Sequence, residues 1–128
     1  MEQSIERMVG LAFLAVGLSH LLRPKGWYQF FAMLRRQGAP GAFINGMISL
    51  SFGVIIVGFH GTQWTGWQAG VTFVGWAQVF KGTLHICFPS YSLRMMGIVT
   101  EERAVRFAWA GALMIPAAGA ILVASFRP

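Results

Sequence analysis

The chain has 128 residues, of which 55% are hydrophobic and 11% are charged, and its mean hydropathy is +0.59. The charged share is about half that of a typical water-soluble domain, which excludes soluble, disordered and disulfide-stabilised classes. The formal net charge of +6 does not indicate nucleic-acid binding, because Lys and Arg lie at the ends of apolar segments and form no separate basic face. The composition predicts an integral membrane protein.

Four apolar segments are each long enough to cross a hydrocarbon layer of roughly 30 Å. They cover residues 5–22, 39–59, 67–88 and 104–126. In lipid each must be helical, because its backbone polar groups have to be satisfied within the segment. The first segment follows an acidic start and lacks the basic region of a secretory signal, so we expect it to remain in the mature protein. The sequence predicts an all-α, four-helix transmembrane bundle that occupies residues 1–128 as a single integral membrane domain.

The connections between these segments carry further signals. In the first connection, residues 23–38, aromatic and leucine side chains recur at helical spacing and predict an amphipathic helix lying at the membrane interface: Trp27, Phe30, Phe31 and Leu34. In the third connection Thr100 precedes Glu101 and Glu102, which predicts that Thr100 caps the N-terminus of the fourth span.

The distribution of basic residues predicts the orientation. The first and third connections contain most of the Lys and Arg residues, whereas the second connection contains none. Basic connections stay on the cytoplasmic side, so we expect the first and third connections there. An even number of spans then places both termini on the outer face.

An internal repeat appears at an offset of 65 residues. Five positions in and just after the first span align, at the same spacing, with five in and just after the third span, and four of the five residues are identical: Gly10, Phe13, Gly17, His20 and Pro24 align with Gly75, Gln78, Gly82, His85 and Pro89. The pattern G-x-x-H-x-x-x-P thus stands at the end of two predicted spans. It predicts two parallel two-helix repeats, at about residues 5–60 and 67–126, related by an axis along the membrane normal.

Small residues predict which helix faces are packed. In the fourth span a small residue or proline stands at every fourth position, and we expect this stripe to face a neighbouring helix: Ala104, Ala108, Ala112, Pro116, Ala120 and Ala124. In the second span Asn45, Ser49 and Gly53 form a polar stripe, which we expect to face the bundle because polar groups are costly in lipid.

Lys81 is the charged residue placed deepest in a predicted span, where a charge costs about 2.5–3.5 kcal/mol and often marks a functional site. Gln78, Lys81 and His85 share one helix face at consecutive turns. One interpretation is that Lys81 extends to the headgroups; the other is a binding or relay role. The only carboxylate within a predicted span, Glu6, lies at the opposite edge, so a buried Lys81 would need an anionic ligand, a lipid phosphate or an acidic partner subunit.

The two repeated histidines, His20 and His85, leave three hypotheses open. Each could bond a backbone carbonyl or a neighbouring connection, both could ligate one haem iron, or they could relay protons or contact a ligand. His60 is expected to be an outer-surface residue. The candidate ligand- or partner-binding residues are therefore Lys81, His85, Gln78, His20, Asn45 and Ser49.

No motif predicts catalysis. The chain has no Asp, no HExxH, no GxSxG and no phosphate-binding loop, and a single cysteine, Cys87, supports neither a disulfide nor a zinc site. We therefore expect no catalytic residue, no metal site and no enzymatic activity of its own.

The glycine spacing resembles that of the DoxX-like family of small bacterial membrane proteins. The resemblance covers the first two spans, through the ladder from Gly10 to Pro24 and through Gly46, Gly53 and Gly58. Where that family often has a glutamate, three residues after the second-span glycine, this chain has Ser49. The resemblance implies a bacterial inner-membrane location and an accessory role in quinone-linked oxidoreductase assemblies, with the carboxylate-dependent part in doubt.

Two main function hypotheses follow. The first is a non-catalytic accessory subunit or binding module that contacts a protein partner, quinone or lipid within a larger membrane complex. The second is a homo-oligomeric transporter or channel with Lys81 and His85 lining its path, because four helices are few to enclose one. A membrane haem carrier that uses His20 and His85 is a third hypothesis.

Overall fold

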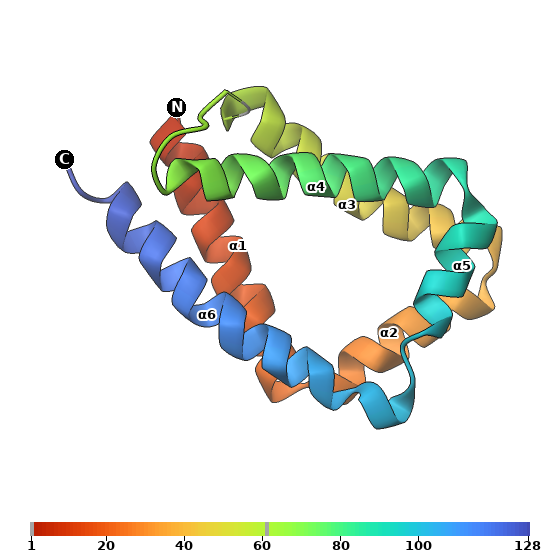
Figure 1. Cartoon of the computed structure of the whole chain (residues 1–128). Coiled ribbons are helices and arrows are strands. Elements are labelled where there is room, and N and C mark those ends of the chain that lie inside the picture. Colours follow the sequence, from red (N-terminus) through yellow and green to blue (C-terminus); the bar gives the residue numbers. More distant parts are fainter. Residues whose placement is uncertain (1, 61) are drawn as a thin grey trace. The chain divides into compact units, whose positions relative to one another are not determined.

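The computed structural model describes residues 2–60 and 62–128, and this part of the chain is 86% helical with no strand, which confirms the all-α class (Figure 1). The helices follow one another in the order α1 (Glu2–Leu22), α2 (Pro24–Arg36), α3 (Ala39–His60), α4 (Gln68–Cys87), α5 (Pro89–Gly97), the 3₁₀ turn η1 (Glu101–Arg103) and α6 (Val105–Ser125). A short helix follows each of α1 and α4, whereas the long helices α3 and α4 follow one another directly.

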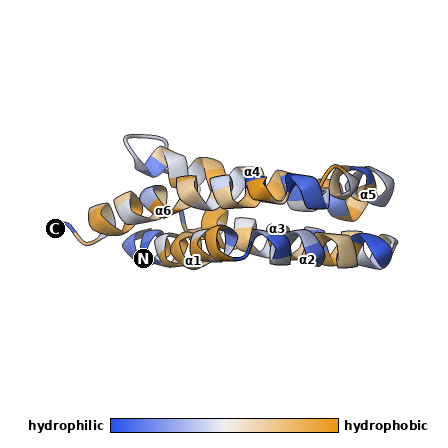
Figure 2. Cartoon of the chain, turned by 90° about the horizontal axis from the view of Figure 1, so that it is seen from below, coloured by the Kyte–Doolittle hydropathy of each residue, from blue (hydrophilic) through white to orange (hydrophobic). Residues whose placement is uncertain are grey.

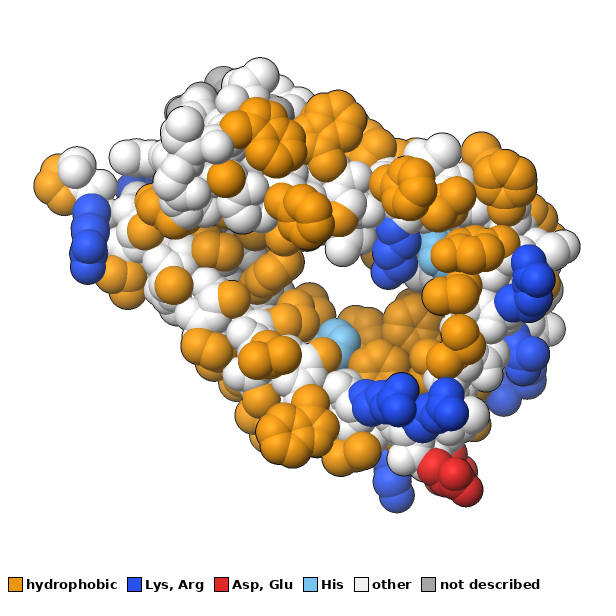
Figure 3. Space-filling view, in the orientation of Figure 1, with side chains coloured by type: hydrophobic (Ala, Val, Ile, Leu, Met, Phe, Trp, Pro, Cys, Tyr) orange, Lys and Arg blue, Asp and Glu red, His pale blue; other side chains and the backbone are white. Residues whose placement is uncertain are grey.

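Three segments of the described chain are long and apolar enough to cross a membrane: Gln3–Leu22, Ala39–His60 and Glu101–Ser125. The third predicted span, residues 67–88, corresponds to α4, a helix of 20 residues that is not among these three segments. Hydrophobic residues run along α1, α4 and α6 (Figure 2), and hydrophobic side chains lie exposed over much of the face seen in Figure 3. Exposed residues such as Leu113 and Trp109 suit a lipid environment.

The described residues form two compact units, one made of residues 2–29 and 100–128 and the other within residues 30–99. In the first unit α1 packs against α6. The contact is made by glycine: a Cβ atom on Gly111 would lie 2.4 Å from the Gly17 carbonyl oxygen. Gly111 and Ala118 are buried in α6, whereas Ala112 and Ala120 are exposed. The stripe of small residues predicted to face a neighbour is therefore not the face that meets α1, since every fourth residue drifts around a helix of 3.6 residues per turn.

In the second unit α3 packs against α4 through four glycines. A Cβ atom on Gly82 would lie 2.5 Å from the Leu50 backbone nitrogen and 2.8 Å from the Gly46 carbonyl oxygen. Two turns along the same interface, a Cβ atom on Gly53 would lie 2.8 Å from the Gly75 carbonyl oxygen. The two backbones thus touch over several turns, which only glycine allows.

The short helices α2 and α5 each begin at a proline directly after a long helix, where fixed φ and the missing N–H suit a first helical turn. The helix predicted in residues 23–38 is confirmed as α2. Its Leu34 is 1% exposed and forms a core cluster with Ala42 and Met96, so part of its apolar face packs on protein. The sequence does not predict helix α5, because its nine residues lie in the connection between the third and fourth predicted spans.

The start of α6 differs from the expectation. Thr100 precedes the 3₁₀ turn Glu101–Arg103, its side chain makes no capping hydrogen bond, and α6 begins only at Val105. The prediction that Thr100 caps the fourth span is wrong, because the acidic residues after it close a tighter turn first.

Candidate functional site

The end of α1 and the start of α2 form a corner around His20. The Nδ1–H of His20 donates to the Val16 carbonyl at 2.7 Å, one helical turn back. The Trp27 ring stacks on the imidazole at 4.1 Å between centroids, and its Nε1–H donates to Ser19 Oγ at 3.0 Å. Phe107 of α6 lies 5.5 Å from the same imidazole. This corner, here called the Trp27 corner, is filled by aromatic rings.

Trp27→Ala should lower the free energy of unfolding by about 1–2 kcal/mol, because it removes a stacked ring and a hydrogen bond from a half-buried site. The measurement is unfolding of the purified chain in detergent by added SDS, followed by circular dichroism. Trp109→Ala removes a tryptophan that is 69% exposed on α6 and should change the free energy by less than about 0.5 kcal/mol. Equal losses in the two variants would contradict the packing role of Trp27.

The end of α4 and the start of α5 form the second corner, around His85. His85 is 6% exposed, and its Nδ1 is hydrogen-bonded to Oγ of Ser92, which is fully buried. The bond joins the last turn of α4 to the first turns of α5 across Pro89. The Tyr91 ring lies 6.3 Å from the imidazole, tilted by 51°. We call this arrangement the Ser92 corner.

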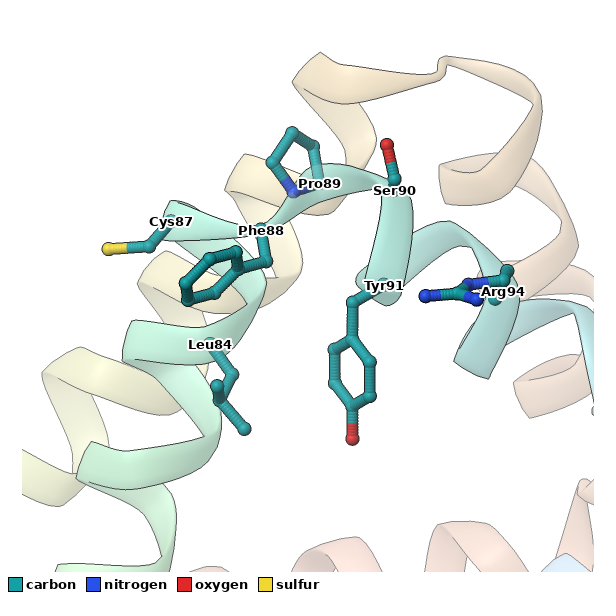
Figure 4. Close-up of a pocket in the computed structure, with 7 residues that line it drawn as sticks. All are labelled: Leu84, Cys87, Phe88, Pro89, Ser90, Tyr91 and Arg94. Carbon is teal, nitrogen blue, oxygen red and sulfur yellow. The ribbon is translucent and has the colours of Figure 1, made fainter.

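A cavity of about 420 Å³ opens at the Ser92 corner. Its lining consists of Leu84, Cys87, Phe88, Pro89, Ser90, Tyr91 and Arg94. Figure 4 shows Tyr91 and Arg94 on α5 opposite Leu84 and Phe88 at the end of α4, whereas the Ser90 hydroxyl points away from them. The cavity therefore combines an apolar wall with a phenol and a guanidinium group.

Lys81 stands one turn before His85 on α4, at the spacing that puts it on the same helix face as Leu84 and Phe88. Its side chain is exposed, and Gln78 is partly buried. Within the described residues neither Lys81 nor Arg94 forms a hydrogen bond or an ion pair. Arg94 in the cavity lining and Lys81 one turn before His85 are thus two cations that have no hydrogen-bonded or ion-paired partner among the described residues.

The structure brings five of the six sequence-predicted residues into one unit: Lys81, His85, Gln78, Asn45 and Ser49. Asn45 and Ser49 are 6% and 5% exposed in α3, close to the Gly46 contact with α4, so the expectation that this polar stripe is packed is met. His20 belongs to the other unit and is described with the Trp27 corner.

Sequence reasoning missed a buried polar pair at the other end of α3 and α4. His60 is 1% exposed and its Nδ1 lies 3.1 Å from the hydroxyl of Thr72, which is fully buried. The Thr72 Oγ1 also lies 2.9 Å from the His60 carbonyl oxygen and 2.7 Å from that of Gln63, and donates to one of them at a time. The expectation that His60 is a surface residue is wrong, because packing of α3 on α4 covers it.

Within residues 2–60 and 62–128 no group of three or more His, Cys, Asp and Glu side chains could hold a metal ion. Comparisons of the chain with known protein families, with curated proteins and with solved structures found no match. The geometry of the two corners is therefore the observation that bears most directly on function.

Proposed function

We propose that the chain is a four-span integral membrane protein that acts as a non-catalytic accessory subunit or binding module, and that the Ser92 corner is its binding site. The main support for this proposal is the cavity between α4 and α5, where Arg94 stands beside an apolar wall and Lys81 lies three residues before the lining residue Leu84. Concave, mostly apolar sites with few polar groups are where small molecules and partner segments bind.

The packing of α4 supports a transmembrane position for the third predicted span, residues 67–88. The segment Ala39–His60 is apolar enough to cross a membrane, and α4 follows it closely from the Gly46–Gly82 contact to the Gly53–Gly75 contact. A helix that touches a spanning helix over several turns lies at the same depth, and α4 satisfies its backbone polar groups internally. With four spans, the positions of Lys and Arg favour an orientation in which both termini lie on the outer face.

The unique cysteine tests this topology. Cys87 is exposed at the end of α4, on the side we assign to the cytoplasm. A membrane-impermeant maleimide should label it in inverted inner-membrane vesicles and leave it unlabelled in intact spheroplasts. A Cys87→Ser, Thr65→Cys variant moves the thiol to the exposed α3–α4 connection and should show the opposite pattern. Labelling of both positions from the same side would contradict a spanning α4.

The two-repeat architecture is supported by contacts at equivalent positions. A shift of 65 residues carries α1 onto α4 and α3 onto α6, so Gly17 packed on Gly111 is the counterpart of Gly82 packed on Gly46. The same shift relates two polar contacts at the other helix ends. Arg7 donates to the Ser125 carbonyl at 3.1 Å, and Thr72 lies within hydrogen-bond distance of the His60 carbonyl. Each unit therefore pairs the first helix of one repeat with the last helix of the other.

The resemblance to the DoxX-like family extends the proposal to the bacterial inner membrane and to an oxidoreductase assembly linked to quinones. The test is native mass spectrometry of the full chain purified in a mild detergent. We expect a defined complex that retains a partner protein or a small molecule, and no turnover by the isolated chain. A bare homo-oligomer that supports solute flux in liposomes, with the flux lost in Lys81→Ala, would overturn the accessory role in favour of transport.

A further inference from the structure

The Trp27 corner and the Ser92 corner occupy equivalent places in the two repeats. In both, a histidine in the last turn of a long helix is followed four residues later by the proline that begins a short helix. In both, the histidine contacts the residue seven positions further along the chain. That residue is Trp27 for His20 and Ser92 for His85. The same corner is thus built twice, from different side chains.

The difference between the corners lies in what fills them. Trp27 lays a large ring against its histidine, and Phe107 approaches from α6. Ser92 reaches its histidine with a single hydroxyl, and the cavity of about 420 Å³ opens beside it. A serine side chain is far smaller than an indole, so less side-chain volume surrounds the histidine of the second corner.

The second repeat also has polar or charged side chains at three positions where the first repeat has an apolar residue, a glycine or a neutral amide. Lys81, Tyr91 and Arg94 stand at the positions equivalent to Val16, Gly26 and Gln29. The matching first-copy residues bring no charge, so the two cations are an addition specific to the open corner. Arg94 on α5 lines the cavity, and Lys81 on α4 stands three residues before Leu84, which also lines it.

The charge of these cations is not balanced within their own unit. Residues 30–99 contain no Asp or Glu, because the four carboxylates of the chain are at positions 2, 6, 101 and 102. A cation near apolar surface is most stable when it is paired or hydrogen-bonded. An anionic group supplied from outside the unit is the partner that fits.

We propose that the Ser92 corner binds an anionic amphiphile, with its anionic head group at Arg94 and Lys81 and its apolar tail along Leu84 and Phe88. This inference rests on the proposed function and names the ligand class of its site. Tyr91 adds a hydroxyl donor on the Arg94 side of the cavity. The guanidinium can form paired hydrogen bonds to a phosphate or carboxylate, while the ammonium acts as a point charge.

The internal repeat indicates which substitutions test the proposal, because each second-repeat residue can be replaced by its first-repeat equivalent. Lys81→Val, Arg94→Gln places the first-copy residues in the second copy, and Arg23→Gln, Lys25→Val removes the same two charges from exposed positions near the Trp27 corner. The full-length chain in detergent is titrated with dioleoyl phosphatidylglycerol and, separately, with dodecyl phosphate, and bound species are counted by native mass spectrometry. Dioleoyl phosphatidylcholine serves as the zwitterionic comparison. Circular dichroism and SDS unfolding verify that each variant is folded.

We expect one anionic amphiphile per chain, bound at least about tenfold more weakly by Lys81→Val, Arg94→Gln and unchanged in Arg23→Gln, Lys25→Val, because a charge-assisted contact is lost only in the first. Preference for phosphatidylglycerol identifies a membrane lipid as the source, and preference for dodecyl phosphate identifies a free amphiphile. Equal binding of phosphatidylcholine, or equal weakening in both double variants, would overturn the proposal.

Two further outcomes separate this inference from the proposed function. If the site variant loses a co-purifying protein while its binding of phosphatidylglycerol is unchanged, the ligand class is wrong and the binding role of the corner stands. If the site variant retains every bound component of the wild type with unchanged affinity, both the ligand class and the assignment of the Ser92 corner as the binding site are wrong.

Discussion

Gly82→Leu should lower the free energy of unfolding by about 3 kcal/mol or more, at the upper end of the cost of overpacking. The first added atom, Cβ, would lie 2.5 Å from the Leu50 backbone nitrogen and 2.8 Å from the Gly46 carbonyl oxygen. Both obstacles are backbone, so rotation of a side chain cannot relieve the clash. Helices α3 and α4 would have to move apart, and the second unit would lose its main contact.

The measurement is SDS-induced unfolding of the purified chain, followed by circular dichroism and by tryptophan fluorescence. Gly70→Leu is the matched control, because Gly70 lies on the same helix and its Cβ would meet no atom within 4 Å. Leucine also favours the helix over glycine, so Gly70→Leu should be neutral or stabilising by up to about 1 kcal/mol. A Gly82→Leu variant as stable as Gly70→Leu would show that α3 and α4 do not pack through these glycines.

Thr72→Val should cost about 2 kcal/mol of unfolding free energy, although the side chain keeps nearly the same volume. The Thr72 hydroxyl is fully buried and lies within hydrogen-bond distance of His60 Nδ1 and of the His60 and Gln63 carbonyl oxygens. Valine offers none of these groups a partner, so at least one of them must reorganise or lose a hydrogen bond. The same SDS titration measures the loss.

Two variants show whether the hydroxyl is responsible. Thr72→Ser keeps the oxygen and should restore most of the stability. Thr83→Val removes a hydroxyl from the same helix, but that hydroxyl is exposed and bonds its own helix at Val79, so we expect a change below about 0.5 kcal/mol. If Thr83→Val were as destabilising as Thr72→Val, the buried pair with His60 would have no special role.

The sequence predicted the helices better than it predicted their contacts. Apolar length placed the segments that became α1, α3, α4 and α6, and the aromatic spacing after Arg23 placed α2. The sequence did not predict helix α5, because its nine residues of mixed polarity show no clear helical period of hydrophobic residues. Its only strong signal was the second proline of the repeat, Pro89, which begins α5 as Pro24 begins α2.

The sequence predicted Lys81 and His85 as candidate site residues. It did not predict Tyr91 and Arg94, the α5 residues that line the cavity. Tyr91 and Arg94 lie in a predicted connection. They approach Leu84 and Phe88 only because α5 folds back at Pro89. The shift of 65 residues could have pointed to them, because it matches Arg94 with a glutamine and Tyr91 with a glycine.

By itself the sequence determined the membrane class and the helical class, since both follow from the number and spacing of apolar residues. Only the tertiary structure decided which face of each helix is packed. In α6, Ala112, Pro116 and Ala120 of the stripe predicted to face a neighbour are exposed, and Gly111 meets α1 instead. In a chain that is apolar all around its helices, hydropathy cannot separate a lipid-facing side from a protein-facing side. That choice is made by close backbone approach and by buried hydrogen bonds such as the one between His60 and Thr72.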